Sequence, residues 1–286
     1  YIFFVSLILL FLVPIIGVEV KGSKRWLDIF FLPRLQPIEL VKPFFIIVLS
    51  TLITFDKFKN FTLKFILTLF LTLLIAFFLI IQPDLGQTLL VGFTWMILIF
   101  ISGVNLVFLL TISVLGLSLL LYFTFYVPKF EYIKNRILSF FNSETGTHNF
   151  QSDKATDSII SGGFFGKGIG EGTLKNRVPE AHTDYIVSVI SEEFGVIVII
   201  LILILFLTFI FSIFKKVNVE KDHKTKLILV GSASLILFQA MIHIGVNIRL
   251  FPTTGMTLPF LSYGGSSIIS ISILSGIILN LTKRKI

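Results

Sequence analysis

Long apolar runs separated by short polar stretches extend along the whole chain. A helix needs roughly 20 mostly apolar residues to cross a bilayer, where every backbone N–H and C=O group must be bonded within the segment. The pattern predicts about eight such spans. They cover, approximately, residues 1–18, 37–55, 62–81, 86–102, 105–127, 185–213, 226–250 and 263–282. We therefore expect an all-α polytopic membrane protein, a helical bundle that forms a single transmembrane domain over residues 1–286.

The composition favours the same class. Hydrophobic residues make up 55% of the 286 positions, and charged residues only 14%, whereas a soluble domain carries about a quarter charged residues. With a mean hydropathy of +0.97, too much apolar surface would face water for a soluble fold. The chain has no Cys, which excludes disulfides, thiolate metal sites and a cysteine nucleophile. The run at residues 1–16 lacks a basic n-region and a small-residue cleavage site, so we do not interpret it as a signal peptide.

The net charge of +8 lies mainly in short connections between the predicted spans. Cytoplasmic connections of membrane proteins are enriched in Lys and Arg, so anionic lipid, and not nucleic acid, is the expected partner of this charge. Three basic connections fall on one side of the predicted arrangement and identify it as cytoplasmic. They contain Lys57 and Lys59; Lys215, Lys216, Lys221, Lys224 and Lys226; and Lys283, Arg284 and Lys285.

Residues 128–184 then form a long extracytoplasmic loop, and residues 19–36 a shorter one. The shorter loop departs from the charge rule, and we expect its cations to have a function: Lys21, Lys24, Arg25 and Arg34. The long loop contains a glycine-rich run at 162–172. Such a run lets backbone N–H groups approach an anionic ligand closely, although a flexible hairpin is the simpler explanation. It lacks the Gly-Lys-Ser/Thr ending of a nucleotide-binding loop.

Asp184 lies where the long loop meets the predicted span 185–213. Two interpretations are open: a helix N-cap, worth roughly 1 kcal/mol, or a general base at the membrane surface. Glu192 follows about two helical turns later, roughly 12 Å away and on a similar face, so both carboxylates are expected along one polar seam. Glu39 and Lys42 are three residues apart and are expected to pair. The four His residues show no metal-ligand spacing, which argues against a zinc site.

Several stretches, in order along the chain, resemble motifs of the SEDS family (shape, elongation, division and sporulation). The central stretch is Pro179-Glu180-Ala181-His182-Thr183-Asp184-Tyr185, followed by Glu192-Glu193-Phe194-Gly195. The others are Gly255–Phe260 with Ser262–Ser267, Gly22–Trp26 with Gln36–Lys42, and Gln82–Gly86. The central stretch is more similar to the member that acts in cell division than to the member that acts in elongation.

The resemblance implies a fold of ten spans with a cytoplasmic N-terminus, so two further spans are expected before this sequence. It also implies a peptidoglycan glycosyltransferase of the bacterial inner (plasma) membrane, at the division septum. Its substrate would be lipid II, an undecaprenyl-pyrophosphate-linked disaccharide pentapeptide, polymerised with inversion at the anomeric carbon. The implied partners are a class B penicillin-binding transpeptidase, other divisome proteins and membrane lipid. A divalent cation, Mg²⁺ or Mn²⁺, is an open expectation with unknown ligands.

Carried onto this chain, the family's catalytic carboxylate is Asp184, which would take the proton from the attacking hydroxyl. Cations for the pyrophosphate and other substrate-binding groups are expected among Lys24, Arg25, Glu39, Lys42, Arg136, Arg177, His182, Thr183, Glu192, Ser262 and Tyr263. Three positions depart from the family pattern: Ile38 replaces a Ser, Thr254 replaces a Lys of the division members, and Arg249 replaces a small residue. Arg249 is the candidate for restoring the charge that is lost at Thr254.

Two other functions compete with the glycosyltransferase. A transporter that flips lipid II would place polar residues at broken helices in mid-membrane, whereas here the polar groups gather at one face and in one outer loop. A scaffold without catalytic activity would leave the glycine-rich run and Asp184 without a role. The pattern therefore favours chemistry at the membrane surface.

Overall fold

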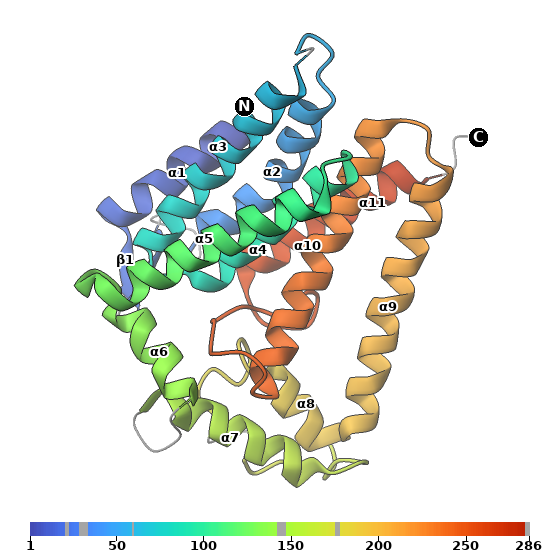
Figure 1. Cartoon of the computed structure of the whole chain (residues 1–286). Coiled ribbons are helices and arrows are strands. Elements are labelled where there is room, and N and C mark those ends of the chain that lie inside the picture. The colour runs from blue at the N-terminus through green and yellow to red at the C-terminus, as the bar shows by residue number, and fades with distance from the viewer. Residues whose placement is uncertain (21–22, 29–33, 59, 142–146, 175–177, 284–286) are drawn as a thin grey trace. The chain divides into compact units, whose positions relative to one another are not determined.

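The computed structural model describes residues 1–20, 23–28, 34–58, 60–141, 147–174 and 178–283, and most of these are helical (Figure 1). In chain order the elements are α1 (Ile2–Ile16), β1 (Val18–Val20), β2 (Ser23–Trp26), α2 (Pro37–Ile53), α3 (Phe61–Ile81), α4 (Leu85–Ile101), α5 (Leu106–Tyr126), η1 (Pro128–Phe130), α6 (Glu131–Phe141), α7 (Thr147–Gly162), α8 (Ile186–Phe194), α9 (Val196–Val219), α10 (His223–Asn247) and α11 (Gly265–Thr282). The two strands pair as an antiparallel hairpin.

The helices follow the apolar runs of the sequence. Within the described residues, α3, α5, α9, α10 and α11 are long and apolar enough to cross a membrane, and α1 and α4 are shorter apolar helices. In α5 and α9 only 6% and 17% of the most apolar window is buried inside the protein, as expected of helices whose solvent is lipid. The predicted all-α polytopic membrane fold is confirmed.

The predicted span 185–213 departs from this agreement. It consists of two helices, α8 and α9, which are separated at Gly195, where the backbone φ is +80°. Glycine adopts this left-handed conformation at little steric cost. The long loop 128–184 also contains the helices α6 and α7, which the apolar pattern did not predict because they are too polar to resemble spans.

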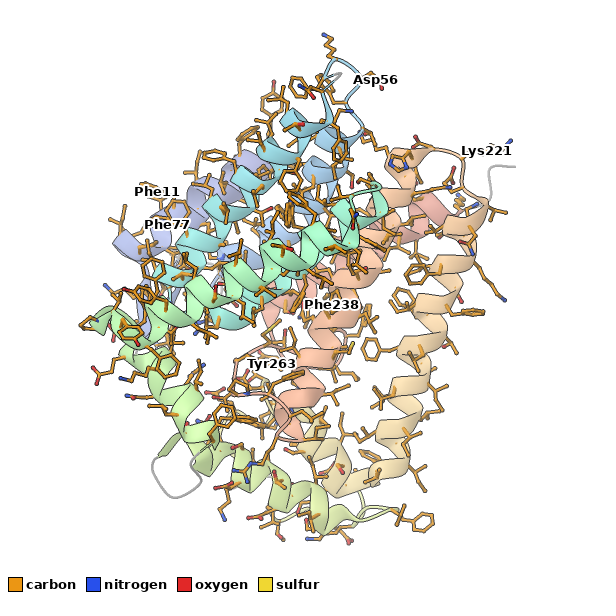
Figure 2. All side chains as sticks on the ribbon, in the orientation of Figure 1. Phe11, Asp56, Phe77, Lys221, Phe238 and Tyr263 are labelled. Carbon is orange, nitrogen blue, oxygen red and sulfur yellow. The ribbon has the colours of Figure 1, made fainter. Side chains whose placement is uncertain are left out.

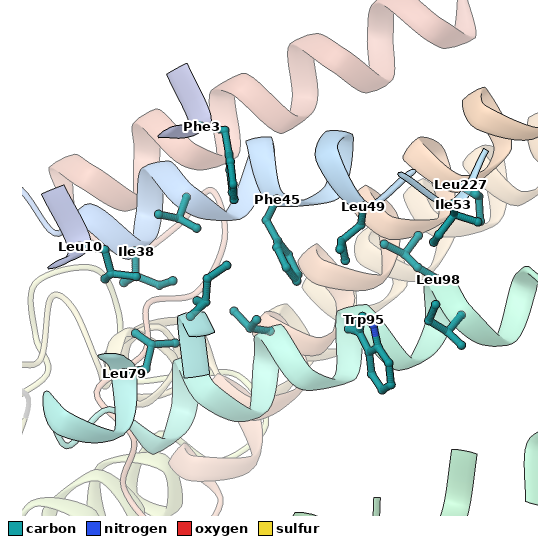
Figure 3. Close-up of a cluster of buried hydrophobic side chains, with 14 of the residues drawn as sticks. Phe3, Leu10, Ile38, Phe45, Leu49, Ile53, Leu79, Trp95, Leu98 and Leu227 are labelled. Carbon is teal, nitrogen blue, oxygen red and sulfur yellow. The ribbon is translucent and has the colours of Figure 1, made fainter. Parts of the chain in front are cut away.

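Tertiary packing divides the chain into two compact units. The first unit comprises Tyr1–Phe123, Ser212–Ile236 and Gly265–Ile286, and the second comprises Thr124–Phe211 and Leu237–Gly264. In the first unit α1 and α11 pack on α2, and α3 packs on α4. Buried side chains from α1, α2, α3, α4 and α10 form its apolar core (Figure 3). In the second unit α7 packs on α8.

Three connections of the first unit lie at the same end of it (Figure 1). They are the α2–α3 connection, the α9–α10 connection and the C-terminal end of α11. Asp56 and Lys221 mark the first two in Figure 2. This is the arrangement expected if all three basic connections are on one side of the membrane.

Candidate functional site

Residues 180–185 form a tight turn, here called the Asp184 turn, in the second unit. The Glu180 carbonyl accepts backbone hydrogen bonds from Thr183, Asp184 and Tyr185, and Glu180 has a φ of +57°. Tyr185 is the N-cap of α8, and its own side chain makes no capping bond. Asp184 therefore lies one residue before the position that the N-cap interpretation requires. Asp184 is half-buried, so it is accessible to a substrate.

A polar ladder on α10 holds this turn from one side; it consists of Gln239, His243 and Asn247, each 0–1% exposed. The Asn247 amide donates to the Asp184 carbonyl oxygen at 3.0 Å, and His243 Nδ1 lies 2.7 Å from the Met256 carbonyl oxygen. The Gln239 amide donates to the Thr257 carbonyl at 3.0 Å. Because residues four apart share a helix face, one face of α10 fixes both loop segments.

The loop before α11 holds the Asp184 turn from another side. The Ser262 hydroxyl donates to the Thr183 carbonyl at 2.7 Å and accepts from the Leu258 amide at 2.8 Å. The Tyr263 amide donates to the His182 carbonyl at 2.9 Å. The Ser262 hydroxyl is thus bonded within the protein, whereas the side chains of His182 and Tyr263 are exposed. The structure therefore brings together five of the predicted site residues: His182, Thr183, Asp184, Ser262 and Tyr263.

The glycine-rich run packs against the C-terminal end of α8. The amides of Lys167 and Gly168 donate to the carbonyls of Glu192 and Glu193 at 2.9 and 3.0 Å. A Cβ atom on Gly166 would lie 2.2 Å from the Glu193 carbonyl oxygen, so this close approach requires glycine. The run therefore supports α8 through hydrogen bonds, in which the backbone amides of Lys167 and Gly168 are donors within the protein.

Glu192 is completely buried, at 0% exposed. Its carboxylate accepts from the Ser158 hydroxyl at 3.0 Å and from the Leu174 amide at 2.9 Å. The Lys167 ammonium lies 3.6 Å from it. The Glu192 carboxylate, which we had expected along a seam with Asp184, is therefore bonded to Ser158 of α7, to Leu174 and to Lys167 of the glycine-rich run.

A second polar cluster is buried in the first unit, where α2 and α4 begin. The Lys42 ammonium donates to the Glu39 carboxylate at 2.8 Å, and the Gln87 amide donates to the same group at 2.9 Å. Lys42 is 0% exposed and Glu39 is 2% exposed. The predicted pairing of Glu39 with Lys42 is confirmed, and it takes place inside the protein.

Arg25 ties the β1–β2 hairpin to the connection between α3 and α4. Its Nε lies 3.6 Å from the Asp84 carboxylate, and its guanidinium donates to the carbonyls of Gln82 and Pro83. The Asp84 carboxylate in turn accepts a hydrogen bond from the backbone N–H of Gln87 at the start of α4. Arg25 is therefore buried in internal bonds, whereas the neighbouring Lys24 is exposed. Arg177 lies outside the described residues.

A cavity in the second unit contains two arginines. It is lined by Arg136, Ser139, Phe140, Ser152, Arg249, Phe251, Pro252 and Thr253. Arg136 on α6 donates to the Thr253 carbonyl at 3.1 Å. Arg249, just after α10, forms an ion pair with Asp153 of α7 at 2.8 Å. Asp153 was not predicted from the sequence, since nothing in its local pattern marks it. The α10 ladder was not predicted either, although polar residues four apart inside an apolar run would have indicated it.

The described residues do not form a metal site for the expected divalent cation. Among the residues that the structure describes, no group of three or more His, Asp or Glu side chains gathers as around a metal ion. The donor set of the described residues does not fit a metal site built from protein ligands alone.

Comparison with known proteins identifies the family. Residues 1–285 match the model of the FtsW, RodA and SpoVE family, described as "Cell cycle protein". The probable peptidoglycan glycosyltransferase FtsW of Caulobacter vibrioides is 33% identical over 100% of this chain and 72% of its own length. The protein of the same name from Trichlorobacter lovleyi is 35% identical over 98% of this chain and 74% of its own length.

Solved structures agree with this match. A chain from a study of the structural coordination of polymerization and crosslinking by a peptidoglycan synthase complex superposes with a TM-score of 0.79. It is 28% identical, and the match covers 99% of this chain and 80% of that one. The rod shape determining protein RodA of Thermus thermophilus gives a TM-score of 0.69 at 28% identity, over 98% of this chain and 76% of its own. The chain described here belongs to the FtsW, RodA and SpoVE family, which is the SEDS family that its motifs resemble.

Proposed function

We propose that this multi-pass membrane protein is a peptidoglycan glycosyltransferase that polymerises lipid II. Relatives that match nearly the whole chain are named for this activity. The observation that carries the proposal is the Asp184 turn. Its half-buried Asp184 is fixed by α10 and by the loop before α11, and the side chains of His182 and Tyr263 beside it are exposed.

The reaction requires one base and a stabilised leaving group. The 4-hydroxyl of the acceptor sugar attacks the anomeric carbon of the lipid-linked donor, and its proton passes to the Asp184 carboxylate. The bond from the anomeric carbon to the pyrophosphate oxygen breaks, and the lipid pyrophosphate leaves with the bonding electrons. Attack from the opposite face converts an α-linked donor into a β-linked product. Cations beside the leaving oxygen lower the barrier.

The other candidate residues divide by what they contact. His182, Thr183 and Tyr263 surround Asp184 and are proposed to meet the sugars. Arg136 lines the cavity of the second unit, and we propose it as a pyrophosphate ligand. Lys24, which lies in the first unit, and Arg177, which lies outside the described residues, stay predictions. The remaining candidates are engaged inside the protein. Glu192 and Ser262 lie in the second unit and are proposed to position the Asp184 turn, whereas Arg25, Glu39 and Lys42 form internal contacts of the first unit.

Partners and location extend the proposal. The similar chain comes from a peptidoglycan synthase complex that coordinates polymerization and crosslinking. On that basis we propose a class B penicillin-binding transpeptidase as the partner, with other divisome proteins, at the division septum. The lipid-exposed helices α5 and α9 are available for a single-span partner.

The decisive experiment compares wild type with Asp184→Asn. The full chain is reconstituted with its transpeptidase partner and fluorescent lipid II, and glycan length is read on a gel. Loss of a general base should lower the polymerisation rate about 100-fold or more, while lipid II binding and thermal stability are retained. Asp157→Asn is the matched control, because this α7 carboxylate is exposed and pairs only with Lys154 among the contacts described; it should keep full activity.

Each outcome is informative. If Asp184→Asn makes as much glycan as wild type, Asp184 is not the base. If wild type itself makes no glycan with the partner present, but moves lipid II across vesicles, the protein is a transporter. Parallel reactions with a chelator test whether the reaction needs a divalent cation. A rate that is unchanged by chelation would show that it needs none.

A further inference from the structure

Three large apolar side chains of the glycine-rich run are exposed, although the run lies outside the predicted spans. Phe164, Phe165 and Ile169, here called the apolar tip, are 72%, 83% and 79% exposed. Single exposed apolar residues are common on protein surfaces, but three within six positions concentrate apolar area as binding surfaces do. The apolar tip is therefore a candidate contact surface for lipid or for another protein.

A closed turn presents the two phenylalanines. The Gly166 amide donates to the Gly162 carbonyl at 2.8 Å. On either side of the Phe164–Phe165 pair, Gly163 and Gly166 have φ values of +57° and +78°, in the left-handed region that favours glycine. The backbone of the turn is thus fixed, and both aromatic side chains remain outside the packed protein.

Hydrogen bonds attach this turn to the start of α9. The amides of Val196 and Ile197 donate to the carbonyls of Gly163 and Phe164 at 3.0 and 3.4 Å, and the run lies beside the α8–α9 junction (Figure 1). Unsatisfied backbone groups keep loops out of the apolar part of a bilayer. Because these carbonyls already have partners, moving the turn from water towards lipid costs less than it would for an open loop.

The length of α9 indicates how deep the turn lies. The sequence has no charged residue between Glu193 and Lys215, and Lys215 and Lys216 mark the cytoplasmic boundary of the span. Nineteen positions separate Val196 from Lys215, which is roughly 28 Å along a helix, and the hydrocarbon core of a bilayer is about 30 Å thick. Val196, to which the turn is bonded, therefore lies at the outer boundary of the hydrocarbon.

The surroundings of the apolar tip favour lipid over a protein partner. Ile197 and Ile200, in the first turns of α9, are exposed, and the most apolar window of α9 is only 17% buried, so the tip continues a surface that lipid already covers. The segment 162–172 contains one cation, Lys167, and one anion, Glu171. With no net charge, it is suited to apolar insertion between headgroups and not to electrostatic attraction.

We propose that Phe164, Phe165 and Ile169 insert into the outer leaflet at the boundary between headgroups and acyl chains, and anchor the glycine-rich run to the membrane surface. The anchor also fixes the depth of α8, because the run is bonded to carbonyls at the C-terminal end of that helix. The Asp184 turn precedes the other end of α8. Insertion of the tip does not depend on the reaction proposed above.

The depth of the tip can be measured by spin labelling, because the chain has no Cys. Full-length protein with Phe165→Cys carries a nitroxide in phosphatidylcholine vesicles, and its collision rates with oxygen and with a water-soluble nickel chelate are compared. Leu207→Cys on α9, 60% exposed, is the lipid reference, and Asp157→Cys, exposed on α7, is the water reference. At Phe165→Cys and Leu207→Cys, oxygen collisions relative to chelate collisions should exceed those at Asp157→Cys severalfold.

A second variant tests whether the phenylalanines carry the insertion. With the label at Ile169→Cys, the change Phe164→Ser/Phe165→Ser should raise chelate collisions severalfold, and the melting temperature in detergent should stay the same because both side chains are exposed. Phe141→Ser is the matched control, because it removes a Phe of α6 that is equally exposed, at 74%, and it should leave the label at Ile169→Cys unchanged. Adding phosphatidylglycerol to the vesicles should not alter the depth, since the segment has no net charge.

Four outcomes would overturn the anchor. Chelate collisions at Phe165→Cys as frequent as at Asp157→Cys would place the tip in water. Low collision rates with both reagents would show that the protein itself covers the tip. A tip that is in water alone, but loses collisions with both reagents when the transpeptidase partner is added, is a protein-docking surface. Insertion only in the presence of phosphatidylglycerol would show electrostatic attraction and not an apolar anchor.

Discussion

Glu39 and Lys42 form an ion pair inside the first unit, and Gln87 donates to the same carboxylate. The spacing of Glu39 and Lys42 predicted their pairing, because residues three apart share a helix face. It did not predict that Gln87, 48 positions away, would complete the environment of the carboxylate, nor that both charges would be almost fully buried. Burial changes the meaning of the pair. Each charge requires the other, because either one alone would be buried in the first unit without a counterion.

Breaking this pair should cost more than replacing it. Lys42→Met or Glu39→Gln leaves one buried charge without its counterion, which costs about 3–5 kcal/mol, whereas the Glu39→Met/Lys42→Met double variant should be close to neutral. Thermal unfolding in detergent gives the order of stabilities. Thr51→Val, which removes a local hydroxyl bond within α2, serves as control. Single variants that unfold like wild type but bind lipid II weakly would instead identify the pair as a substrate ligand.

Elements show the same division between local pattern and long-range contact. The apolar run at 185–213 was correctly predicted to be helical, but not its interruption at Gly195. The break depends on the glycine-rich run, about 30 residues earlier, whose backbone lies against it: a Cβ at Gly195 would lie 2.1 Å from the Phe164 carbonyl oxygen. No local signal apart from the glycine itself reports that contact.

Two glycine-to-alanine changes should therefore have opposite effects. Gly195→Ala combines a positive φ with this backbone clash and should destabilise the second unit by at least about 1–3 kcal/mol. Gly276→Ala, in the middle of α11 with open space around its Cβ position, should stabilise by about 0.5–1 kcal/mol. Differential scanning fluorimetry of both variants checks the prediction. Equal melting temperatures for the two would show that Gly195 is not under steric constraint.

The whole chain is the scale at which the sequence was most informative. A bilayer accepts only segments that bond their own backbone, so apolar length alone predicted the helices α1–α5, α10 and α11 within a few residues. The predicted span 185–213 instead covers α8 and most of α9. The Asp184 turn was found through motif resemblance, and its surroundings were not. Its supports come from Asn247 and Ser262, 63 and 79 positions away, and such contacts leave no trace in a local pattern.

Orientation in the membrane can be tested directly, because the chain has no Cys. Single Cys substitutions at Tyr263, which is 78% exposed, and at the exposed Lys221 should react with a membrane-impermeant maleimide from opposite sides. Intact cells should label Tyr263→Cys from outside, and Lys221→Cys should need a disrupted membrane. Leu279→Cys, 69% exposed on the apolar helix α11, should stay unlabelled in both because lipid covers it. Labelling with the sides reversed would refute the charge-based orientation.

The junction between α8 and α9 has a consequence for insertion into the bilayer. The amides of Lys167 and Gly168 satisfy carbonyls at the end of α8, and the amides of Val196 and Ile197 bond to the carbonyls of Gly163 and Phe164. The backbone groups at the helix break and in the glycine-rich run thus bond to each other and not to water. Each backbone group left unsatisfied in hydrocarbon would cost several kcal/mol. The amides of Val196 and Ile197 at the start of α9 therefore have carbonyl partners when the glycine-rich run is folded against them, which couples the folding of this extramembrane segment to the insertion of α9.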